Sequence, residues 1–319
     1  MNIVFLGSSK FAVPSLRQII SSTHKIICVV TQPDRVGGRG LTLSCTEVKK
    51  LAQAYKLRIY QPESINSQES IEFLRGLSAD IFVVVAFGQI LSGEVLEIPK
   101  ILCINLHASL LPKYRGAAPI NRAIINGENK TGLTVIKMVE KLDAGPIILQ
   151  KQIDIQDNDD AVSLQETLAD SGGEQIQQVL NLIQDKKHRL VIQDESGATY
   201  APKLKKEDGL IHWDKSARSI FNLIRGCAGW PGAFTYYQNK ILKIHKVSLV
   251  LSTSQAIGPV AGRPGEVLEI SKKGIVVASG DGNLLIEQLQ VEGKKKITAS
   301  EFISGYKIPV GELLGGKSS

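Results

Sequence analysis

The sequence predicts an α/β protein whose first half forms a doubly wound parallel sheet and whose second half forms a small β-barrel. The first half alternates short apolar runs with stretches whose apolar residues recur at helical spacing. Near residue 190 the pattern changes to polar, turn-rich sequence and then to several short strand-like runs. With 319 residues, the chain is long enough for two hydrophobic cores.

The apolar runs of the first half are typical of buried parallel strands. They lie at residues 2–6 (NIVFL), 26–31 (IICVVT), 81–86 (IFVVVA) and 103–106 (CINL). Amphipathic stretches separate them, one from Phe11 to Ile20 and another over residues 47–56. Strands that are apolar on both faces and alternate with helices indicate a parallel sheet covered on both sides. Such a sheet binds its ligands at the carboxyl ends of its strands.

The second half predicts a helix followed by a small barrel of Greek-key or OB-like type. One amphipathic helix is expected over residues 216–227. Short strands follow at residues 233–237, 241–251, 265–270, 275–278 and 284–289, with hairpin signals at Gly274 and Asp281-Gly282. We therefore expect a first domain at residues 1–189, a linker at 190–208 and the barrel domain at 209–319.

The composition is that of a globular protein. Hydrophobic residues make up 43% and charged residues 22% of the chain, which argues against disorder. The longest apolar runs are too short to cross a bilayer, and no basic stretch with an apolar h-region begins the chain. The four cysteines are scattered without a CxxC pair, so neither a disulfide framework nor a metal site is predicted. A cytoplasmic monomer without membrane contact is expected.

Positive charge is concentrated in the second half. The net charge is +7, and residues 206–319 hold 15 Lys and Arg against 10 Asp and Glu, whereas the preceding residues hold 23 against 21. A basic domain favours a polyanionic partner such as a nucleic acid. Many soluble proteins carry a similar charge, so this signal alone leaves the partner open.

The residues that can carry chemistry lie in two stretches, 105–118 (NLHASLLPKYRGAA) and 132–145 (GLTVIKMVEKLDAG). Asn105 and His107 alternate along a predicted strand, so their side chains point to the same face at its carboxyl end. Asp143 follows another predicted strand in a turn. An amide N–H or an imidazolium can stabilise a negative carbonyl oxygen, and a carboxylate can stabilise a charged imidazole or take a proton through water. Such a trio can transfer a formyl group to an amine without a metal or a covalent nucleophile.

These two stretches resemble the formyltransferase family that uses 10-formyltetrahydrofolate. The family pattern is Asn-x-His, then Ser-Leu-Leu-Pro, then an Asp in a Leu-Asp-x-Gly turn, and all three elements occur here in that order. The resemblance implies a Rossmann-like formyltransferase domain followed by an OB-like barrel. It implies catalytic roles for Asn105, His107 and Asp143, with no metal. It also implies a site for the co-substrate 10-formyltetrahydrofolate, lined by Phe87, Gly88, Ile90, Ser109, Leu110, Leu111 and Pro112.

Further features resemble the members of this family that act on methionyl-tRNA. The loop at residues 31–40 (TQPDRVGGRG) places Arg35 and Arg39 among glycines, and arginine binds phosphate bidentately. By resemblance, this loop enters the acceptor arm of initiator methionyl-tRNA, with Arg39 as its main contact. On its residues alone it is equally an ordinary surface loop.

The remaining expected tRNA contacts lie after the Ser-Leu-Leu-Pro motif and in the basic half. Arg115 either faces the entrance of the site or is a structural ion-pair partner. Lysines of the second half are the other candidates, each of which is alone more typical of a solvated lysine: Lys203, Lys205 and Lys206, with 294–296.

The sequence thus predicts an enzyme that formylates the amino group of methionine on initiator methionyl-tRNA. The alternative enzyme is a folate-dependent formyltransferase with a small-molecule amine acceptor. A different class, a nucleic-acid-binding protein that kept the fold and lost catalysis, conflicts with the intact trio of Asn105, His107 and Asp143.

Overall fold

A computed structural model describes residues 1–37, 42–250 and 262–315, which divide into two compact units. The first unit comprises Met1–Pro119, Lys130–Asp154 and Gln165–Ala201, and the second comprises Ile120–Asn129, Ile155–Leu164 and Pro202–Ser319. Each unit is thus built from segments that are not contiguous in the sequence. The sequence-based domain limits at residues 189 and 209 stay a prediction.

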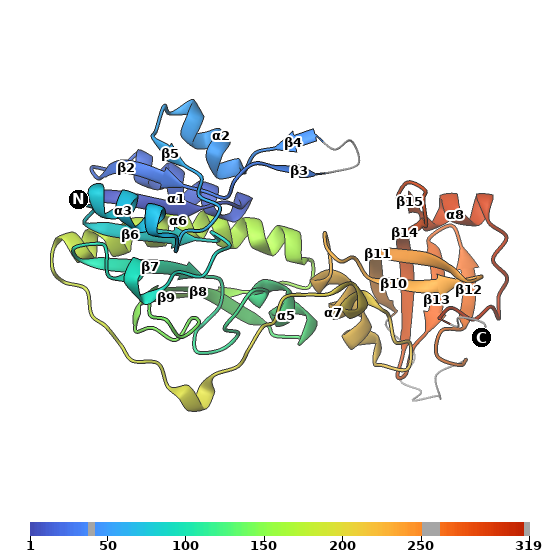
Figure 1. Cartoon of the computed structure of the whole chain (residues 1–319). Helices are drawn as coiled ribbons and strands as arrows, with labels where there is room; N and C mark the ends of the chain where they lie inside the picture. Colours follow the sequence, from blue (N-terminus) through green and yellow to red (C-terminus); the bar gives the residue numbers. More distant parts are fainter. Residues whose placement is uncertain (38–41, 251–261, 316–319) are drawn as a thin grey trace. The chain divides into compact units, whose positions relative to one another are not determined.

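The first unit is built on a seven-stranded sheet in the order β5-β2-β1-β6-β7-β8-β9 (Figure 1). The first five of these strands pair in parallel, and the last two are added antiparallel. Their bounds are β1 (Asn2–Gly7), β2 (Lys25–Val30), β5 (Ile59–Tyr60), β6 (Ile81–Val85), β7 (Leu102–His107), β8 (Lys130–Lys137) and β9 (Ile147–Asp154). A separate two-stranded hairpin joins β3 (Arg35–Gly37) to β4 (Thr42–Ser44). The order reverses at β1, which has β2 on one side and β6 on the other, so the predicted doubly wound, Rossmann-like fold is confirmed.

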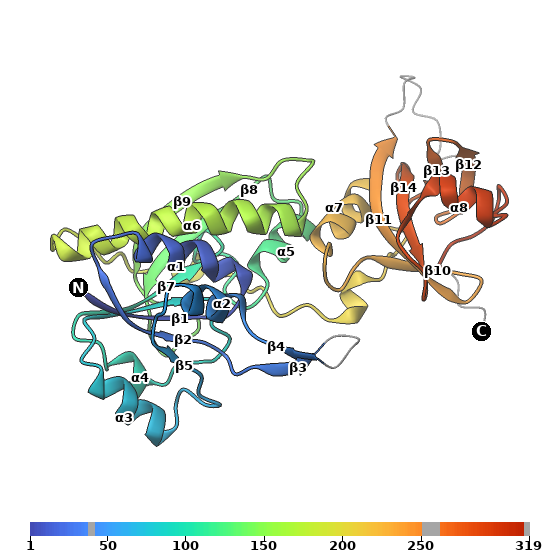
Figure 2. The same cartoon turned by 90° about the horizontal axis from the view of Figure 1, so that it is seen from above.

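Helices cover both faces of this sheet (Figure 2). One face carries the long helix α6 (Ala161–Gln184) and α1 (Val13–Ile20), with α2 (Glu47–Ala54) beside α1, and the other carries α3 (Gln68–Gly76) and α4 (Gly93–Leu96). Gly172 lets α6 approach β7, since a Cβ there would lie 2.6 Å from Cδ2 of Leu106. On the opposite face, Leu74 of α3 and Val95 of α4 share a buried cluster with Phe82 of β6. None of the helices in the described part of the chain is long and apolar enough to span a bilayer.

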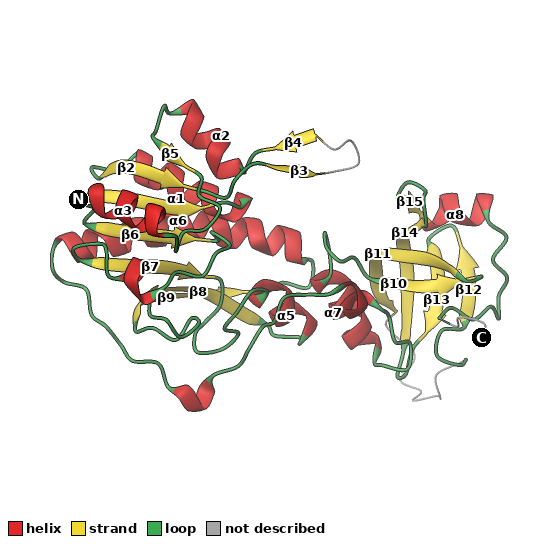
Figure 3. Ribbon diagram, viewed as in Figure 1, coloured by secondary structure: helices red, strands yellow, loops and turns green. Residues whose placement is uncertain are grey.

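The second unit contains an antiparallel sheet in the order β10-β11-β14-β13-β12, with β15 paired to β14 (Figure 3). The strands are β10 (Phe234–Tyr237), β11 (Lys240–Val250), β12 (Val267–Ser271), β13 (Gly274–Ala278), β14 (Asn283–Val291) and β15 (Ile297–Thr298). Its helices are α5 (Pro119–Ile125), α7 (Ala217–Gly226) and α8 (Ala299–Gly305). The structure confirms the predicted helix at 216–227 and the five predicted strands. Most of the observed ends lie within about two residues of the predicted ones.

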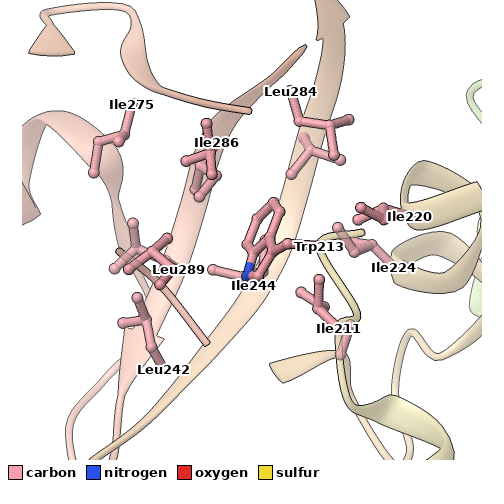
Figure 4. Close-up of a cluster of buried hydrophobic side chains, with 14 of the residues drawn as sticks. Ile211, Trp213, Ile220, Ile224, Leu242, Ile244, Ile275, Leu284, Ile286 and Leu289 are labelled. Carbon is pink, nitrogen blue, oxygen red and sulfur yellow. The ribbon is translucent and has the colours of Figure 1, made fainter. Parts of the chain in front are cut away.

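A single apolar cluster holds this second unit together (Figure 4). Ile220 and Ile224 on one face of α7 pack with Ile244 and Leu289 of the sheet. Trp213 lies among them, and its Nε1 donates a hydrogen bond of 3.0 Å to Oγ1 of the buried Thr235. Burial of these side chains is the main force that stabilises the sheet.

Truncating this cluster should destabilise the second unit. Leu289 has no exposed surface, so Leu289→Ala leaves a cavity and should cost about 2–5 kcal/mol of unfolding free energy. Both tryptophans of the chain belong to this unit, so urea unfolding followed by tryptophan fluorescence reports on it. The matched control is Leu313→Ala at a side chain that is 43% exposed, which should cost less than about 0.5 kcal/mol. Equal losses in the two variants would contradict this description of the core.

Candidate active site

The imidazole of His107 is held between two acceptors at the carboxyl end of β7. Its Nε2 lies 2.9 Å from the carbonyl oxygen of Tyr114, and its Nδ1 lies 3.5 Å from Oδ2 of Asp143. A carbonyl oxygen only accepts, so Nε2 donates to it. His107 is 6% exposed, and Asp143 is also largely enclosed. The structure therefore brings the expected His and Asp together, although they lie on different segments of the chain.

Asp143 lies in a turn with a strained backbone, and Gly145 is needed for the path of that turn. Its φ of +48° lies in the left-handed region, which costs an L residue roughly 1–2 kcal/mol. A Cβ on Gly145 would collide with the carbonyl oxygen of Lys137, so only glycine fits there. The backbone N–H of Gly116 donates a hydrogen bond of 2.8 Å to Asp143 Oδ2, the same oxygen that faces His107. The turn thus aims one carboxylate oxygen at the imidazole.

Asn105 lies two residues before His107 on the same face of β7. It is half-buried and stands in register with Val84 of β6 and Ile136 of β8. Its side-chain amide forms no hydrogen bond within the described part of the chain, so its N–H groups are available to a ligand. The predicted alternation of Asn105 and His107 on one strand face agrees with this register.

The loop that follows β7 is fixed from the two antiparallel strands. Thr134 Oγ1 of β8 donates to the carbonyl oxygen of Ser109 at 2.6 Å and accepts from the backbone N–H of Leu111. Gln150 Nε2 of β9 donates to the carbonyl oxygen of Leu111 at 2.7 Å. The side chains of Ser109 and Leu111 are buried and hold the loop in shape, while Leu110 and Pro112 are partly exposed.

The loop after β7 forms one wall of the candidate ligand site. The residues that follow β1 and β6, at the switch in strand order, form another. Ser8, directly after β1, donates from its hydroxyl to the carbonyl oxygen of Phe87 at 2.9 Å, which ties the ends of β1 and β6 together. Gly88 has a φ of +91°, and Ile90 is 78% exposed.

Arg115 is a structural residue in this unit. Its side chain has no exposed surface and forms a bidentate ion pair with Glu195, at 2.9 and 3.1 Å. Its Nε and Nη2 also donate to Oε1 of Gln193, at 3.2 and 2.7 Å. The expected contact of Arg115 with tRNA does not fit this placement, and the alternative of an ion-pair partner does.

Residues 193–201, which lie within the expected linker, run along the site and include a short 3-10 helix at Glu195–Gly197. The carbonyl oxygen of Thr199 accepts a hydrogen bond of 2.8 Å from the backbone N–H of Arg115. The carbonyl oxygen of Arg115 in turn accepts one of 2.7 Å from the backbone N–H of Ala201. Gln193 reaches the turn of Asp143. The roles of Gln193, Glu195 and Thr199 cannot be recognised from the sequence, because a polar stretch without periodicity gives no sign of what it packs against.

Of the other residues expected to contact tRNA, those that the structure describes lie on the surface. Arg35 is exposed and forms a 3.2 Å ion pair with the exposed Glu63, and three basic residues of the second unit are also exposed: Lys203, Lys205 and Lys206. Arg39 lies outside the described residues. Within the ranges that the structure covers, no cluster of three His, Cys, Asp or Glu side chains could hold a metal ion.

Comparison with known proteins identifies the family. Models described as formyl transferase and as formyl transferase, C-terminal domain, match residues 1–180 and 203–307. A Geobacter sulfurreducens protein named methionyl-tRNA formyltransferase is 43% identical over 319 residues, covering 100% of this chain and 98% of its own. A Moorella thermoacetica protein of the same name is 44% identical over 315 residues, covering 99% of each. The chain therefore belongs to the formyl transferase family.

A solved structure shows the same fold. The sugar 3N-formyl transferase WlaRD, crystallised in the presence of dTDP and 5-N-formyl-THF, superposes with a TM-score of 0.67 over 92% of this chain and 99% of that one. The two sequences are 21% identical, so this likeness concerns the architecture.

The ion pair beside the site should make the stability of the first unit depend on pH. The Arg115 guanidinium and then the Lys141 ammonium lower the pKa of Glu195 from 4.5 to about 2. A carboxylate with a lowered pKa stabilises the fold above its unfolded value and loses this effect as the pH falls through the folded value. Glu195→Gln should therefore lower Tm at neutral pH, and its difference from the native protein should shrink between about pH 4.5 and pH 2.

Thermal unfolding followed by far-ultraviolet circular dichroism at several pH values measures this difference. Glu63→Gln, at an exposed ion pair, is the matched control and should change Tm little. A Glu195→Gln difference that stays constant across the acid range would refute the assigned role of Glu195.

Proposed function

We propose that this chain transfers the formyl group of 10-formyltetrahydrofolate to the amino group of methionine on initiator methionyl-tRNA. The product is N-formylmethionyl-tRNA for translation initiation. The observation that carries the proposal is the His107 imidazole, held between Tyr114 and Asp143 at the end of the strand that presents the unpaired amide of Asn105. Family membership and the names of full-length relatives support the same reaction.

The trio can perform each step of the transfer. The methionine nitrogen attacks the formyl carbon, and the carbonyl oxygen gains negative charge as a tetrahedral intermediate forms. The Asn105 amide stabilises this oxygen by donating a hydrogen bond. The ring nitrogens of His107 face Tyr114 and Asp143, so His107 contributes through the positive charge that the Asp143 carboxylate favours on its imidazole. Asp143, directly or through water, takes the proton that the amine loses. The carbonyl double bond then re-forms, the bond from carbon to folate N10 breaks, and N10 leaves with the proton that Asp143 returns.

The folate would lie at the carboxyl ends of β1, β6 and β7. Parallel sheets bind ligands at such a switch in strand order. The backbone after β6, with Phe87, Gly88 and Ile90, and the fixed loop after β7, from Ser109 to Pro112, offer hydrogen-bonding groups and apolar walls for a pterin. The presence of 5-N-formyl-THF with the structurally similar WlaRD supports a folate here.

The tRNA would meet two basic regions. We assign Arg35 and Arg39 of the 31–40 loop to the acceptor arm, and Lys203, Lys205 and Lys206 to backbone phosphates. Exposed basic side chains bind a polyanion through phosphate contacts, and the charge excess of residues 206–319 supports this assignment. Arg115 is not included, since its guanidinium is buried in an ion pair. We expect the protein to act as a cytoplasmic monomer.

A transfer assay tests the reaction and the acceptor together. The protein is mixed with 10-formyltetrahydrofolate and, in separate reactions, initiator methionyl-tRNA, elongator methionyl-tRNA or free methionine. We expect N-formylmethionine only, or much faster, with the initiator. Transfer to free methionine at an equal rate would favour a small-molecule acceptor, and absence of transfer to initiator tRNA would refute the proposal.

Removing the Asp143 carboxylate should stop the chemistry and leave the fold intact. Asp143→Asn keeps an oxygen for the Gly116 N–H but removes the negative charge beside His107. The expected loss of kcat is about 10²–10⁴-fold, with a native circular dichroism spectrum. Asp185→Asn, at an exposed carboxylate, is the control and should keep native kcat. Full activity of Asp143→Asn would show that this carboxylate takes no part.

A further inference from the structure

Gln193 binds the turn that carries Asp143. Its side chain is 5% exposed, and its Nε2 donates two hydrogen bonds of 2.8 Å, one to the carbonyl oxygen of Asp143 and one to that of Gly145. These two carbonyls lie on either side of Ala144, whose N–H closes the turn on the carbonyl oxygen of Lys141. Both bonds lie in the first unit, next to the residue whose backbone is in the left-handed region.

The orientation of this amide is fixed from its other side. Two N–H groups of Arg115 donate to Gln193 Oε1, so the NH₂ group must face the turn. Arg115 is in turn held by both oxygens of Glu195, and Lys141 binds Glu195 at 2.7 Å. Charge-assisted hydrogen bonds therefore run from the surface to Gln193, and the Gln193 amide continues the chain to the Asp143 turn.

The same segment also fixes the second partner of His107. The hydroxyl of Thr199 accepts the backbone N–H of Tyr114 at 2.8 Å, and the Thr199 carbonyl accepts that of Arg115. The carbonyl oxygen of Tyr114, which binds His107 Nε2, therefore lies on backbone that this segment holds. Both acceptors around the imidazole are thus supported by residues 193–201.

We propose that Gln193 is a positioning residue, which holds the left-handed turn so that the Asp143 carboxylate faces His107 and the Gly116 N–H. The inference rests on the proposed formyl transfer. Among the described residues, the Gln193 side chain binds the two carbonyls of the turn and Arg115, so its removal lets the carboxylate shift without taking away a ligand contact. A misplaced Asp143 carboxylate lowers kcat, whereas KM stays the same because the contacts with the substrates remain.

The chain offers a closely matched control. Gln175 is 2% exposed, and its Nε2 also donates to two carbonyl oxygens, those of Leu133 and Leu149. Methionine has nearly the length of glutamine but makes no amide hydrogen bond. Gln193→Met and Gln175→Met thus each remove a buried amide that donates to two carbonyls, in the same unit, and Gln193→Met also removes the acceptor of Arg115. The native protein and both variants are assayed for kcat, for the KM of each substrate and for Tm.

Gln193→Met should lower kcat by about 10–100-fold, with both KM values within about twofold of native. Gln175→Met should lose stability but keep native kcat. Gln193→Asn places the same amide on a shorter side chain and should restore less than half of the lost kcat. The inference is wrong if Gln193→Met keeps native kcat, if only its KM values change, or if Gln175→Met loses as much kcat.

Glu195→Gln decides the question should Gln193→Met not fold. It acts at the exposed end of the same chain of contacts, so a smaller loss of kcat with unchanged KM values supports the role, and native kcat refutes it. A native protein that transfers no formyl group would instead refute the proposed function before any variant is compared. The two failures are therefore distinguishable.

Discussion

The contact between His107 and Asp143 depends on two backbone groups that lie close together in the sequence. The carbonyl of Tyr114 holds one side of the imidazole, and the N–H of Gly116 holds the carboxylate that faces the other side. The 3.5 Å separation of the two side chains is therefore set by the path of the backbone between these residues. Any element that holds this backbone also holds the site, which explains why residues 193–201 pack along it.

The sheet provides the rigid frame for this arrangement. Asn105 and His107 belong to β7, which pairs with β6 on one side and β8 on the other. The antiparallel strands β8 and β9 contribute Thr134 and Gln150, which fix the loop after β7. A site built on strand ends is held more precisely than one on free loops, because the ladder of hydrogen bonds limits movement. The folate site that we propose shares the same strand ends.

The fold was largely predictable because its signals are local. Apolar runs in the first half gave β1, β2, β6 and β7, and the alternation of Asn105 and His107 followed from the strand period alone. The candidate trio was predictable because its motifs occur together in order. Even so, its assignment to formyl transfer came from resemblance, since an isolated His or Asp beside a strand is compatible with a structural role.

What could not be predicted depends on contacts between distant residues. Gln193 and Asp143 are separated by 50 positions in the sequence, and Arg115 and Glu195 by 80. The residues next to Arg115 in the sequence therefore do not show whether its side chain is buried or exposed. The strand β9 was also missed, because its sequence, IILQKQID, combines a three-residue apolar run with mostly polar residues and does not alternate strictly. Residues 193–201 have the composition of a linker, yet their backbone completes the hydrogen bonding of the site. Tertiary pairing decides such segments, and their own composition does not.

The central claim is that His107 and Asp143 act as one unit in formyl transfer. A double-mutant cycle of single-turnover rates with His107→Asn, Asp143→Asn and both changes together measures their coupling directly. If two residues act as one unit, the first substitution already removes their joint contribution to the rate. The account therefore predicts that the double variant is no slower than the slower single variant. Rate losses that multiply in the double variant would show two independent residues and would contradict the account.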